Sequence, residues 1–212
     1  MLTAVATGMR RGELLALCWG DVDWNSRRVW VRRNVTHRGV FQEPKTRGSV
    51  RAIAMPATLA TALREHQMAS RFKDSEDLIF STEKGTTIDG HNFVHRVFDP
   101  ALRQAGLPKI RFHDLRHSFA SLLIAQGEHP KLISEQLGHA SVQITLDRYG
   151  HLLPASYDSA GERLDAALFG SELQAFANSG PGTGVRAIPP NGTDQAESPV
   201  LMRLAVAGDG IR

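Results

Sequence analysis

From residue 113 to about 168 the sequence keeps one pattern, in which apolar residues recur three or four positions apart. This spacing puts apolar side chains on one face of an α-helix. Gly127 and Pro130 separate the first two runs, and such residues favour the end of one helix and the first turn of the next. The pattern therefore predicts consecutive helices over 113–126, 130–137, 141–149 and 156–168.

The stretch between residues 28 and 55 differs, because it holds short runs rich in Val, Ile and Phe. Such runs predict strands, here near 28–33, 40–44 and 50–55. Upstream, "MLTAVATG" and "RRGELLALCW" have helical spacing through Cys18, broken at Gly8, and "GDVDWNS" is typical of a turn. We therefore expect an α+β fold that is mainly helical, with a small three-stranded antiparallel sheet.

Two further segments complete the predicted domain. "DLIF" is typical of a short strand, and "DGHNFVHRVFDPALRQAG" of a helix that begins near Asp89 and that Pro100 breaks or kinks. After Gly170 the sequence is dominated by Gly, Pro, Ser and Asn, a composition that favours disorder. The expected organisation is one domain over 1–169 and a disordered tail over 170–212.

The composition is that of a globular protein, with 42% hydrophobic and 22% charged residues. No stretch approaches the roughly 18 apolar residues of a transmembrane helix, and the N-terminus lacks the residue order of a signal peptide. Cys18 is the single cysteine, so no intrachain disulfide can form, as is usual in the reducing cytosol. We expect a cytoplasmic protein without membrane contact.

Positive charge is concentrated in one part of the chain. The net charge is only +3, yet residues 27 to 51 hold eight basic residues against one acid, Glu43. A solvated face is one interpretation of such a run. Because the run coincides with strand-like sequence, which would align the cations along a hairpin, a nucleic-acid surface is the other. The candidate DNA contacts are Arg32, Arg33, Arg47 and Arg51.

The helix predicted from residue 113 has a polar face opposite its apolar one. Positions three and four apart share a face, so we expect it to bury Leu115, Phe119 and Leu122. The other face then carries His113, Arg116 and His117. A guanidinium is a fixed planar cation suited to phosphate oxygens, and histidine changes protonation near neutral pH. This face is a candidate site for chemistry on a phosphate.

Other residues could join that face. Arg10 follows a Thr-Gly break at the start of a helix, where backbone N–H groups favour an anion, and Glu13 could orient it. Lys45 lies on a predicted hairpin turn from which its amine could reach a cleft. His139 can exchange a proton, and Tyr149 offers a hydroxyl that can attack a phosphate.

Five segments carry a family resemblance: "TGMRRGELLALCWGDVD", "PKTRGSVRAIAMP", "HDLRHSFAS", "LGHAS" and "TLDRYGH". In order and spacing they resemble the tyrosine recombinases, the phage-integrase family, from about residue 1 to 169. The resemblance implies a site-specific recombinase or integrase with the catalytic-domain fold of that family. It also implies DNA cleavage through a 3′-phosphotyrosyl intermediate and a free 5′ hydroxyl.

Residue roles follow from the same segments. Tyr149 resembles the nucleophile, and Lys45 the hairpin lysine that protonates the leaving 5′ oxygen. Arg10 and Arg116 look like the two catalytic arginines, with Glu13 as the buried companion of the first.

The histidines complete the resemblance. His113 matches the first position of the His-x-x-Arg pair, and His139 the position that the family fills with His or Trp. Because bond energy is conserved in such a reaction, no ATP, metal or other cofactor is implied.

The implied partner is double-stranded DNA, on which the full-length protein would act as a homo-tetramer in the nucleoid. The family's N-terminal DNA-clamping domain has no counterpart here, so we interpret the chain as an N-terminally truncated catalytic domain. In relatives a helix after the nucleophile often docks on a neighbouring subunit.

Two other interpretations fit parts of the sequence. His113 and His117 have the spacing of a zinc-binding helix, but Arg116 between them would repel the ion. The segment "HPKLISEQLGHASVQITLDRYG" is also typical of a helix-turn-helix in a non-catalytic DNA-binding protein. In that case Gln143, Thr145 and Arg148 would face bases, and Tyr149 would only pack.

Overall fold

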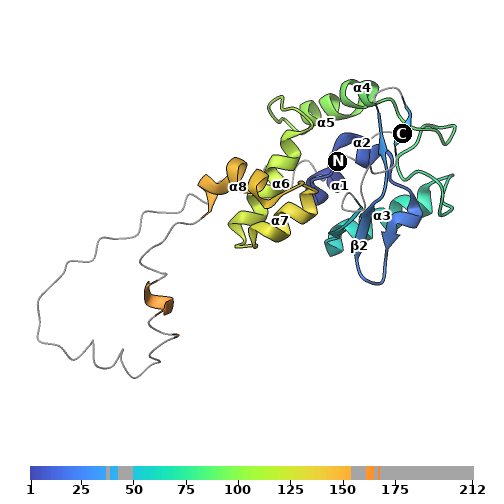
Figure 1. Ribbon diagram of the computed structural model, residues 1–212. Helices are drawn as coiled ribbons and strands as arrows, with labels where there is room; N and C mark the ends of the chain where they lie inside the picture. Colours follow the sequence, from blue (N-terminus) through green and yellow to red (C-terminus); the bar gives the residue numbers. More distant parts are fainter. Residues whose placement is uncertain (37–38, 43–49, 154–160, 165–166, 168–212) are drawn as a thin grey trace, which may run out of the picture. The chain divides into compact units, whose positions relative to one another are not determined.

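The computed structural model describes residues 1–36, 39–42, 50–153, 161–164 and 167 (Figure 1). Residues Met1–Leu152 form one compact unit, and the described residues that follow belong to a second. All side chains discussed below lie in the first unit. The predicted tail over 170–212 lies outside the described residues, and the domain boundary at 169 stays a prediction.

The first unit is mainly helical with short strands, as predicted. Its strands are β1 (Val22–Asp23), β2 (Arg28–Val31), β3 (Asn34–Val35), β4 (Phe41–Gln42) and β5 (Arg51–Ala54). Its α-helices are α1 (Leu2–Thr7), α2 (Arg11–Leu15), α3 (Ala57–Ala69), α4 (Gly90–Phe93), α5 (Asp99–Gln104), α6 (Asp114–Ala125), α7 (Pro130–Leu137) and α8 (Val142–Tyr149). Shorter turns are η1 (Trp19–Asp21), the π-helix η3 (Val94–Phe98) and η4 (Gly150–Leu152).

The three-stranded antiparallel sheet has the order β1–β2–β5. Strands β2 and β5 confirm the predicted strands near 28–33 and 50–55, and Val31 lies opposite Arg51. The strand predicted near 40–44 forms as β4 but belongs to another sheet, so the third strand here was not predicted. It is β1, within the expected turn "GDVDWNS", where buried Val22 pairs with Val29. Strand β4 instead pairs with β3 in a separate ribbon, where both of its residues are exposed.

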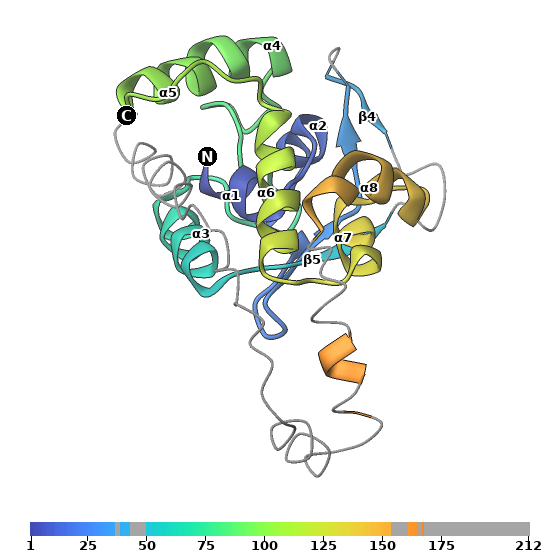
Figure 2. The same cartoon turned by 90° about the vertical axis from the view of Figure 1, so that its left-hand side faces the viewer.

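Helix α6 lies at the centre of the unit. It contacts α1 and α7, and both views show it beside them (Figures 1 and 2). Helix α7 in turn contacts β5 and α8. The core of this arrangement is aliphatic, with fully buried Leu115, Ile133, Leu137 and Ile53. A polar group on α6 therefore faces neighbouring helices as well as solvent.

This central position corrects the predicted faces of α6. Leu115 and Phe119 are buried as expected, but Leu122 is 36% exposed. Arg116, expected on a polar face, is only 3% exposed. Because α6 packs on more than one side, the guanidinium points toward backbone carbonyls of its neighbours.

Helix α2 ends earlier than its apolar spacing predicts. It stops at Leu15, and Cys18 forms an antiparallel bridge with Leu78. The Ile79 amide donates to the Leu17 carbonyl at 2.8 Å. The predicted strand "DLIF" is thereby reduced to this bridge, because its backbone pairs with the end of the α2 segment.

Pro100 does not break the helical segment that begins after Asp89. Helix α4 runs into the π-helix η3, and α5 follows with Pro100 in its first turn. Proline is tolerated there, because the wider preceding turn relieves the need for its missing N–H. Within the described ranges, none of the helices has the length and apolar character needed to cross a membrane.

Candidate active site

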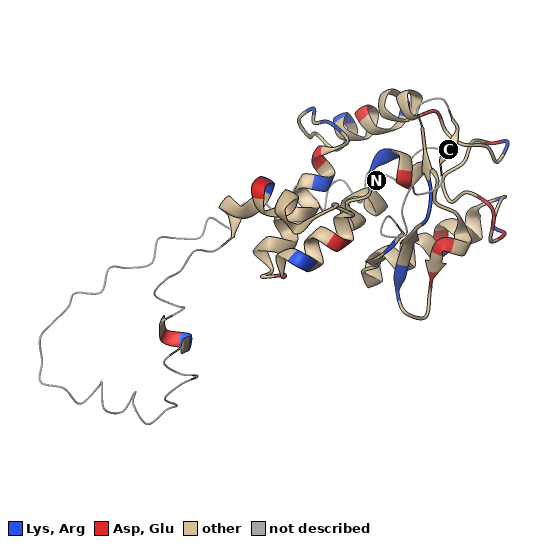
Figure 3. Ribbon diagram, in the orientation of Figure 1, with Lys and Arg blue, Asp and Glu red and all other residues tan. Residues whose placement is uncertain are grey.

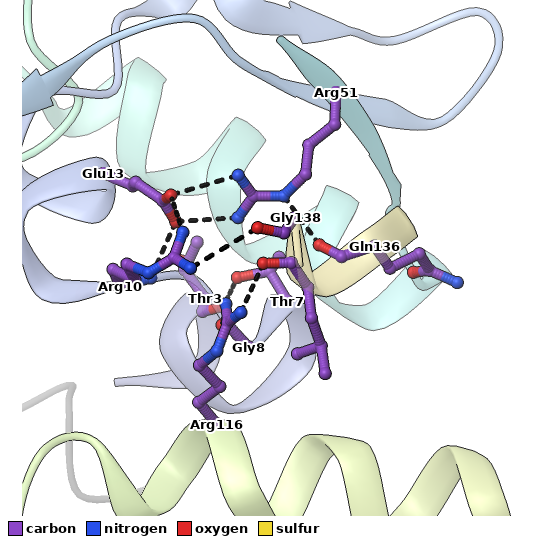
Figure 4. Close-up of polar contacts among 10 residues, drawn as sticks. Thr3, Thr7, Gly8, Arg10, Glu13, Arg51, Arg116, Gln136 and Gly138 are labelled. Carbon is purple, nitrogen blue, oxygen red and sulfur yellow. Dashed lines mark hydrogen bonds and ion pairs between the residues drawn. The ribbon is translucent and has the colours of Figure 1, made fainter. Parts of the chain in front are cut away.

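Three arginines from separate elements converge on the C-terminal end of α7 (Figure 4). The last carbonyls of a helix lack partners within it, and that end carries a partial negative charge. Each of the three guanidinium groups donates to one of three consecutive carbonyls. The pairs are Arg51 with Gln136 at 2.7 Å, Arg116 with Leu137, and Arg10 with Gly138 at 3.4 Å.

Glu13 connects two of these arginines. Its Oε1 lies 2.9 Å from Arg10 Nη1 and 3.1 Å from Arg51 Nη1, and its Oε2 lies 2.7 Å from Arg51 Nη2. Burial raises the pKa of the Glu13 carboxyl. The hydrogen bonds and charges of Arg51 and Arg10 lower it by more than burial raises it, so the net pKa is below its ordinary value. The carboxylate stays ionised and holds the side chain of Arg10 in place.

Arg10 is the more accessible of the two arginines predicted to be catalytic. It caps the start of α2, and its backbone N–H donates to Glu13 at 2.8 Å. Its side chain is 46% exposed, and the hydrogen bond from its Nη2 to the Gly138 carbonyl is long, at 3.4 Å. Part of this guanidinium is therefore available to an anion arriving from solvent.

Arg116 is held more tightly. Its Nη1 donates to the Gly8 carbonyl at 2.9 Å, and its Nη2 donates to Leu137. Burial, with the charge of Arg10 as the next cause, lowers the pKa of Arg116 to about 10. An anion placed beside the two guanidinium groups of Arg116 and Arg10 would relieve the repulsion between them.

Two glycines let the backbone approach these arginines. Gly8 has φ +58°, and a Cβ there would lie 2.5 Å from Phe119 Cδ1. Gly138 has φ +64°, and a Cβ there would lie 2.8 Å from Arg51 Nη1. Both positions need the left-handed conformation that glycine adopts most easily.

His139 follows Gly138 directly. Its Nδ1 lies 2.9 Å from the Thr145 hydroxyl, one turn before Tyr149 on α8. Burial, followed by the charges of Arg116 and Arg10, lowers the pKa of His139 to about 4. The imidazole is therefore neutral at neutral pH, and its Nε2 can act as a hydrogen-bond donor when Nδ1 accepts from Thr145.

His113 and His117 lie one turn apart at the start of α6. Their rings are 5.0 Å apart in an edge-to-face arrangement. His113 is exposed, but part of its ring is shielded from water, and this shielding, then the charges of His117, Arg116 and Arg10, lowers its pKa. The same two arginines thus act on His113 and His139.

Tyr149, the last residue of α8, is buried. Its hydroxyl lies 2.8 Å from His117 Nδ1. Burial raises the pKa of the phenol, and the charges of Arg116 and Arg148 oppose this rise, so the net pKa is above its ordinary value. Tyr149 therefore interacts electrostatically with Arg116.

The predicted DNA contacts differ in how exposed they are. Figure 3 shows basic residues on β2 and just after it. Arg33 Nη2 lies 2.7 and 2.8 Å from the oxygens of buried Asp21, whereas Arg32 is 46% exposed with one 3.4 Å contact to the same carboxylate. Arg32 therefore has the freer charge of the two.

Arg51 does not lie on the surface where the charge run predicted it. Its side chain is 8% exposed and is bonded to Glu13 and the Gln136 carbonyl. The charge run suggested a surface position, but residues alternate in and out along a strand, and β5 turns this one inward. The interpretation of Arg51 as a surface contact is wrong. Lys45 and Arg47 lie outside the described residues.

The sequence did not indicate the part that three residues play in the site: Arg51, Thr145 and His117. The alternation of strand β5 could have indicated the first. Thr145, which the helix-turn-helix interpretation placed against DNA bases, is 2% exposed and bonded to His139. His117, which the helical spacing placed only on the polar face of α6, contacts the tyrosine itself.

The fold is shared with solved integrases. The Tn1549 transposon integrase in complex with a circular intermediate DNA aligns with a TM-score of 0.64 and 22% identity, covering 78% of this chain and 57% of that one. The catalytic domain of bacteriophage HP1 integrase aligns with a TM-score of 0.51 and 21% identity, over 78% and 80% of the two chains. The fold is therefore that of an integrase catalytic domain.

Sequence comparison gives the family. Residues 1–155 match the family described as "Phage integrase family", and the chain belongs to it. A "Tyrosine recombinase XerC-like" protein of Caldanaerobacter subterraneus subsp. tengcongensis is 34% identical, over 77% of this chain and 48% of the relative. The ICEBs1 integrase of Bacillus subtilis is 33% identical, over 78% and 47%. The chain thus spans about half the length of these curated relatives.

Proposed function

We propose that this protein cleaves and rejoins DNA strands as a tyrosine-type site-specific recombinase. Tyr149 attacks a backbone phosphate of double-stranded DNA, which forms a 3′-phosphotyrosyl bond and releases the 5′ oxygen. A 5′ hydroxyl of a second strand later reverses the step. Neither step changes the number of phosphoester bonds, so no external energy source is needed.

One observation carries this proposal. The guanidinium groups of Arg10 and Arg116 donate to the neighbouring carbonyls of Gly138 and Leu137, directly before His139, and the charge of Arg116 also acts on Tyr149. These residues come from segments up to 139 positions apart in the chain, counted from Arg10 to Tyr149. A set of donors and cations around one nucleophile suits the charge that builds on a phosphate in the transition state.

Each side chain has a chemical role in this proposal. Arg10 and Arg116 bind the non-bridging oxygens, and neutral His139 donates a hydrogen bond to one of them. His113 lies beside them as a further donor. Lys45 protonates the leaving 5′ oxygen, and exposed Arg32 contacts the DNA backbone next to the site.

We further propose that the full-length protein works as a homo-tetramer on DNA. Solved relatives support a DNA partner, since the Tn1549 integrase and the XerH recombinase are described in complex with DNA. Buried, hydrogen-bonded Thr145 argues against the alternative of a non-catalytic helix-turn-helix, because that role needs this side chain to face bases.

The test is a suicide DNA substrate that carries a nick beside the cleavage site, so that the released strand diffuses away. The purified protein should form a covalent adduct that survives denaturant and disappears in Tyr149→Phe. Salt-reversible binding without an adduct would instead support the DNA-binding alternative.

A second comparison separates catalysis from affinity. Arg10→Ala should lower adduct formation by orders of magnitude while weakening DNA binding only modestly. Exposed Arg103 on α5 offers the control, since Arg103→Ala removes the same charge away from the site. Equal losses of binding and cleavage in Arg10→Ala would assign Arg10 to affinity.

A further inference from the structure

The hydroxyl of Tyr149 forms a hydrogen bond with His117, a histidine to which the family resemblance gives no catalytic role. His117 Nδ1 lies 2.8 Å from the phenolic oxygen, and the two rings are 5.8 Å apart and tilted. The residues come from different helices, α6 and α8, which makes the contact a tertiary one. A 2.8 Å distance is typical of a well-formed hydrogen bond.

Resting on the proposed function, we infer that His117 Nδ1 accepts the phenolic proton when Tyr149 attacks. In that step the O–H bond of Tyr149 breaks and its proton moves to His117. The phenolic oxygen forms a bond to phosphorus, and the bond from phosphorus to the 5′ oxygen breaks. The 5′ oxygen takes its own proton from Lys45, so the nucleophile and the leaving group are served by different residues.

The environment of Tyr149 creates the need for such an acceptor. Burial keeps the pKa of the phenol above its ordinary value despite the charges of Arg116 and Arg148. The phenol is therefore protonated at neutral pH and must lose its proton during attack. A base must lie within hydrogen-bond reach of the proton that it takes, and His117 meets that condition before any substrate binds.

The neighbours of His117 are compatible with this role. Among the described residues, the titratable groups that interact with it include His113, one turn earlier on α6, Asp114 in the same first turn, and Tyr149 from α8. Asp114 is ionised and paired with Arg111 at 2.9 Å.

Three variants at this position distinguish proton acceptance from positioning. His117→Ala removes both the hydrogen bond and the base, and adduct formation should fall by about 10²- to 10⁴-fold, the usual contribution of a general base. His117→Asn can hold the tyrosine hydroxyl with its amide but cannot take a proton, so it should be nearly as slow. A rate close to wild type in His117→Asn would show that His117 only positions Tyr149.

A substrate with sulfur at the bridging 5′ position isolates the tyrosine side of the reaction, because a thiolate leaves without a proton. On this substrate Lys45→Ala should recover most of its lost rate, whereas His117→Ala should stay slow. Recovery of His117→Ala to the same extent would place His117 on the leaving-group side and overturn the inference. His151→Ala, an exposed histidine two positions after Tyr149, is the matched control and should behave as wild type.

A readout without DNA tests the direction of the hydrogen bond. Nitrogen NMR of the imidazole at neutral pH should show His117 with its proton on Nε2 and a bare Nδ1 that accepts from Tyr149. A proton on Nδ1 would overturn the inference, because that nitrogen would then be the donor. If wild type forms no adduct, the proposed function fails, while the NMR result still decides whether His117 is the acceptor.

Discussion

Glu13 and Arg51 form a buried ion pair in which two guanidinium nitrogens donate to the two carboxylate oxygens, at 3.1 and 2.7 Å. The pair links α2 to β5, 38 positions later in the chain. Arg51 also donates to the end of α7, so one buried cation joins three elements around the candidate site. The position of Arg10 depends on this pair, because Arg10 shares the same carboxylate.

Replacing Arg51 with methionine should destabilise the fold. Glu13 would keep its buried charge without its main partner, and loss of one member of a buried pair costs about 3–5 kcal/mol. Urea denaturation measures the free energy of unfolding. The double variant Glu13→Gln, Arg51→Met should recover part of the loss. Unchanged stability together with weaker DNA binding would mean that Arg51 reaches DNA after all.

His139 should remain neutral well below the usual range of histidine. Its pKa in the folded protein is about 4, against an ordinary value of 6.5. Between these values the unfolded chain binds a proton that the folded chain does not, so this residue lowers stability as the pH falls through that window. A proton NMR titration of the imidazole measures the pKa. Titration near 6.5 would contradict the burial and the arginine charges described for this ring.

Gly8→Ala should lower stability by more than a left-handed conformation alone requires. The conformational cost for an L-residue is about 1–2 kcal/mol, and the new Cβ would also collide with Phe119. Gly106 is the matched control, with φ +67° and open space where its Cβ would lie. Thermal or urea unfolding of both alanine variants gives the difference. Equal losses would show that Phe119 moves aside without cost.

Arg32 and Arg33 should separate binding from stability. Arg32→Ala should reduce the dependence of DNA affinity on salt by about one counterion, as loss of a phosphate contact does, with little effect on unfolding. Arg33→Ala leaves buried Asp21 without its closest cation and should destabilise the fold by about 1–3 kcal/mol. Salt titration of affinity and urea denaturation distinguish the two. The opposite pattern would assign the DNA contact to Arg33.

Local pattern alone was enough for much of this fold. The spacing of apolar residues placed α6, α7 and α8, with Tyr149 at the end of α8. The runs of branched residues placed β2 and β5. These elements are predictable because their side chains repeat with the period of the helix or the strand.

The packing partners of each helix and strand could not be predicted from the local sequence pattern. The third strand came from an expected turn, and the region near 40–44 formed a separate ribbon, because strand pairing depends on contacts distant in sequence. Helix α6 turned Arg116 inward because two other helices cover it. The spacing of apolar residues identifies the apolar face of a helix or strand, but it does not show which other element packs on that face.

The sequence by itself determined the family, most of the helices and the order of the candidate catalytic residues, since all of these depend on residue type and spacing along the chain. Only the tertiary structure decided that Arg51 is an internal partner of Glu13, that Thr145 holds His139, and that His117 contacts the tyrosine hydroxyl. Each of these contacts joins side chains from different segments. Their geometry is set by how helices and strands pack together, which no local period encodes.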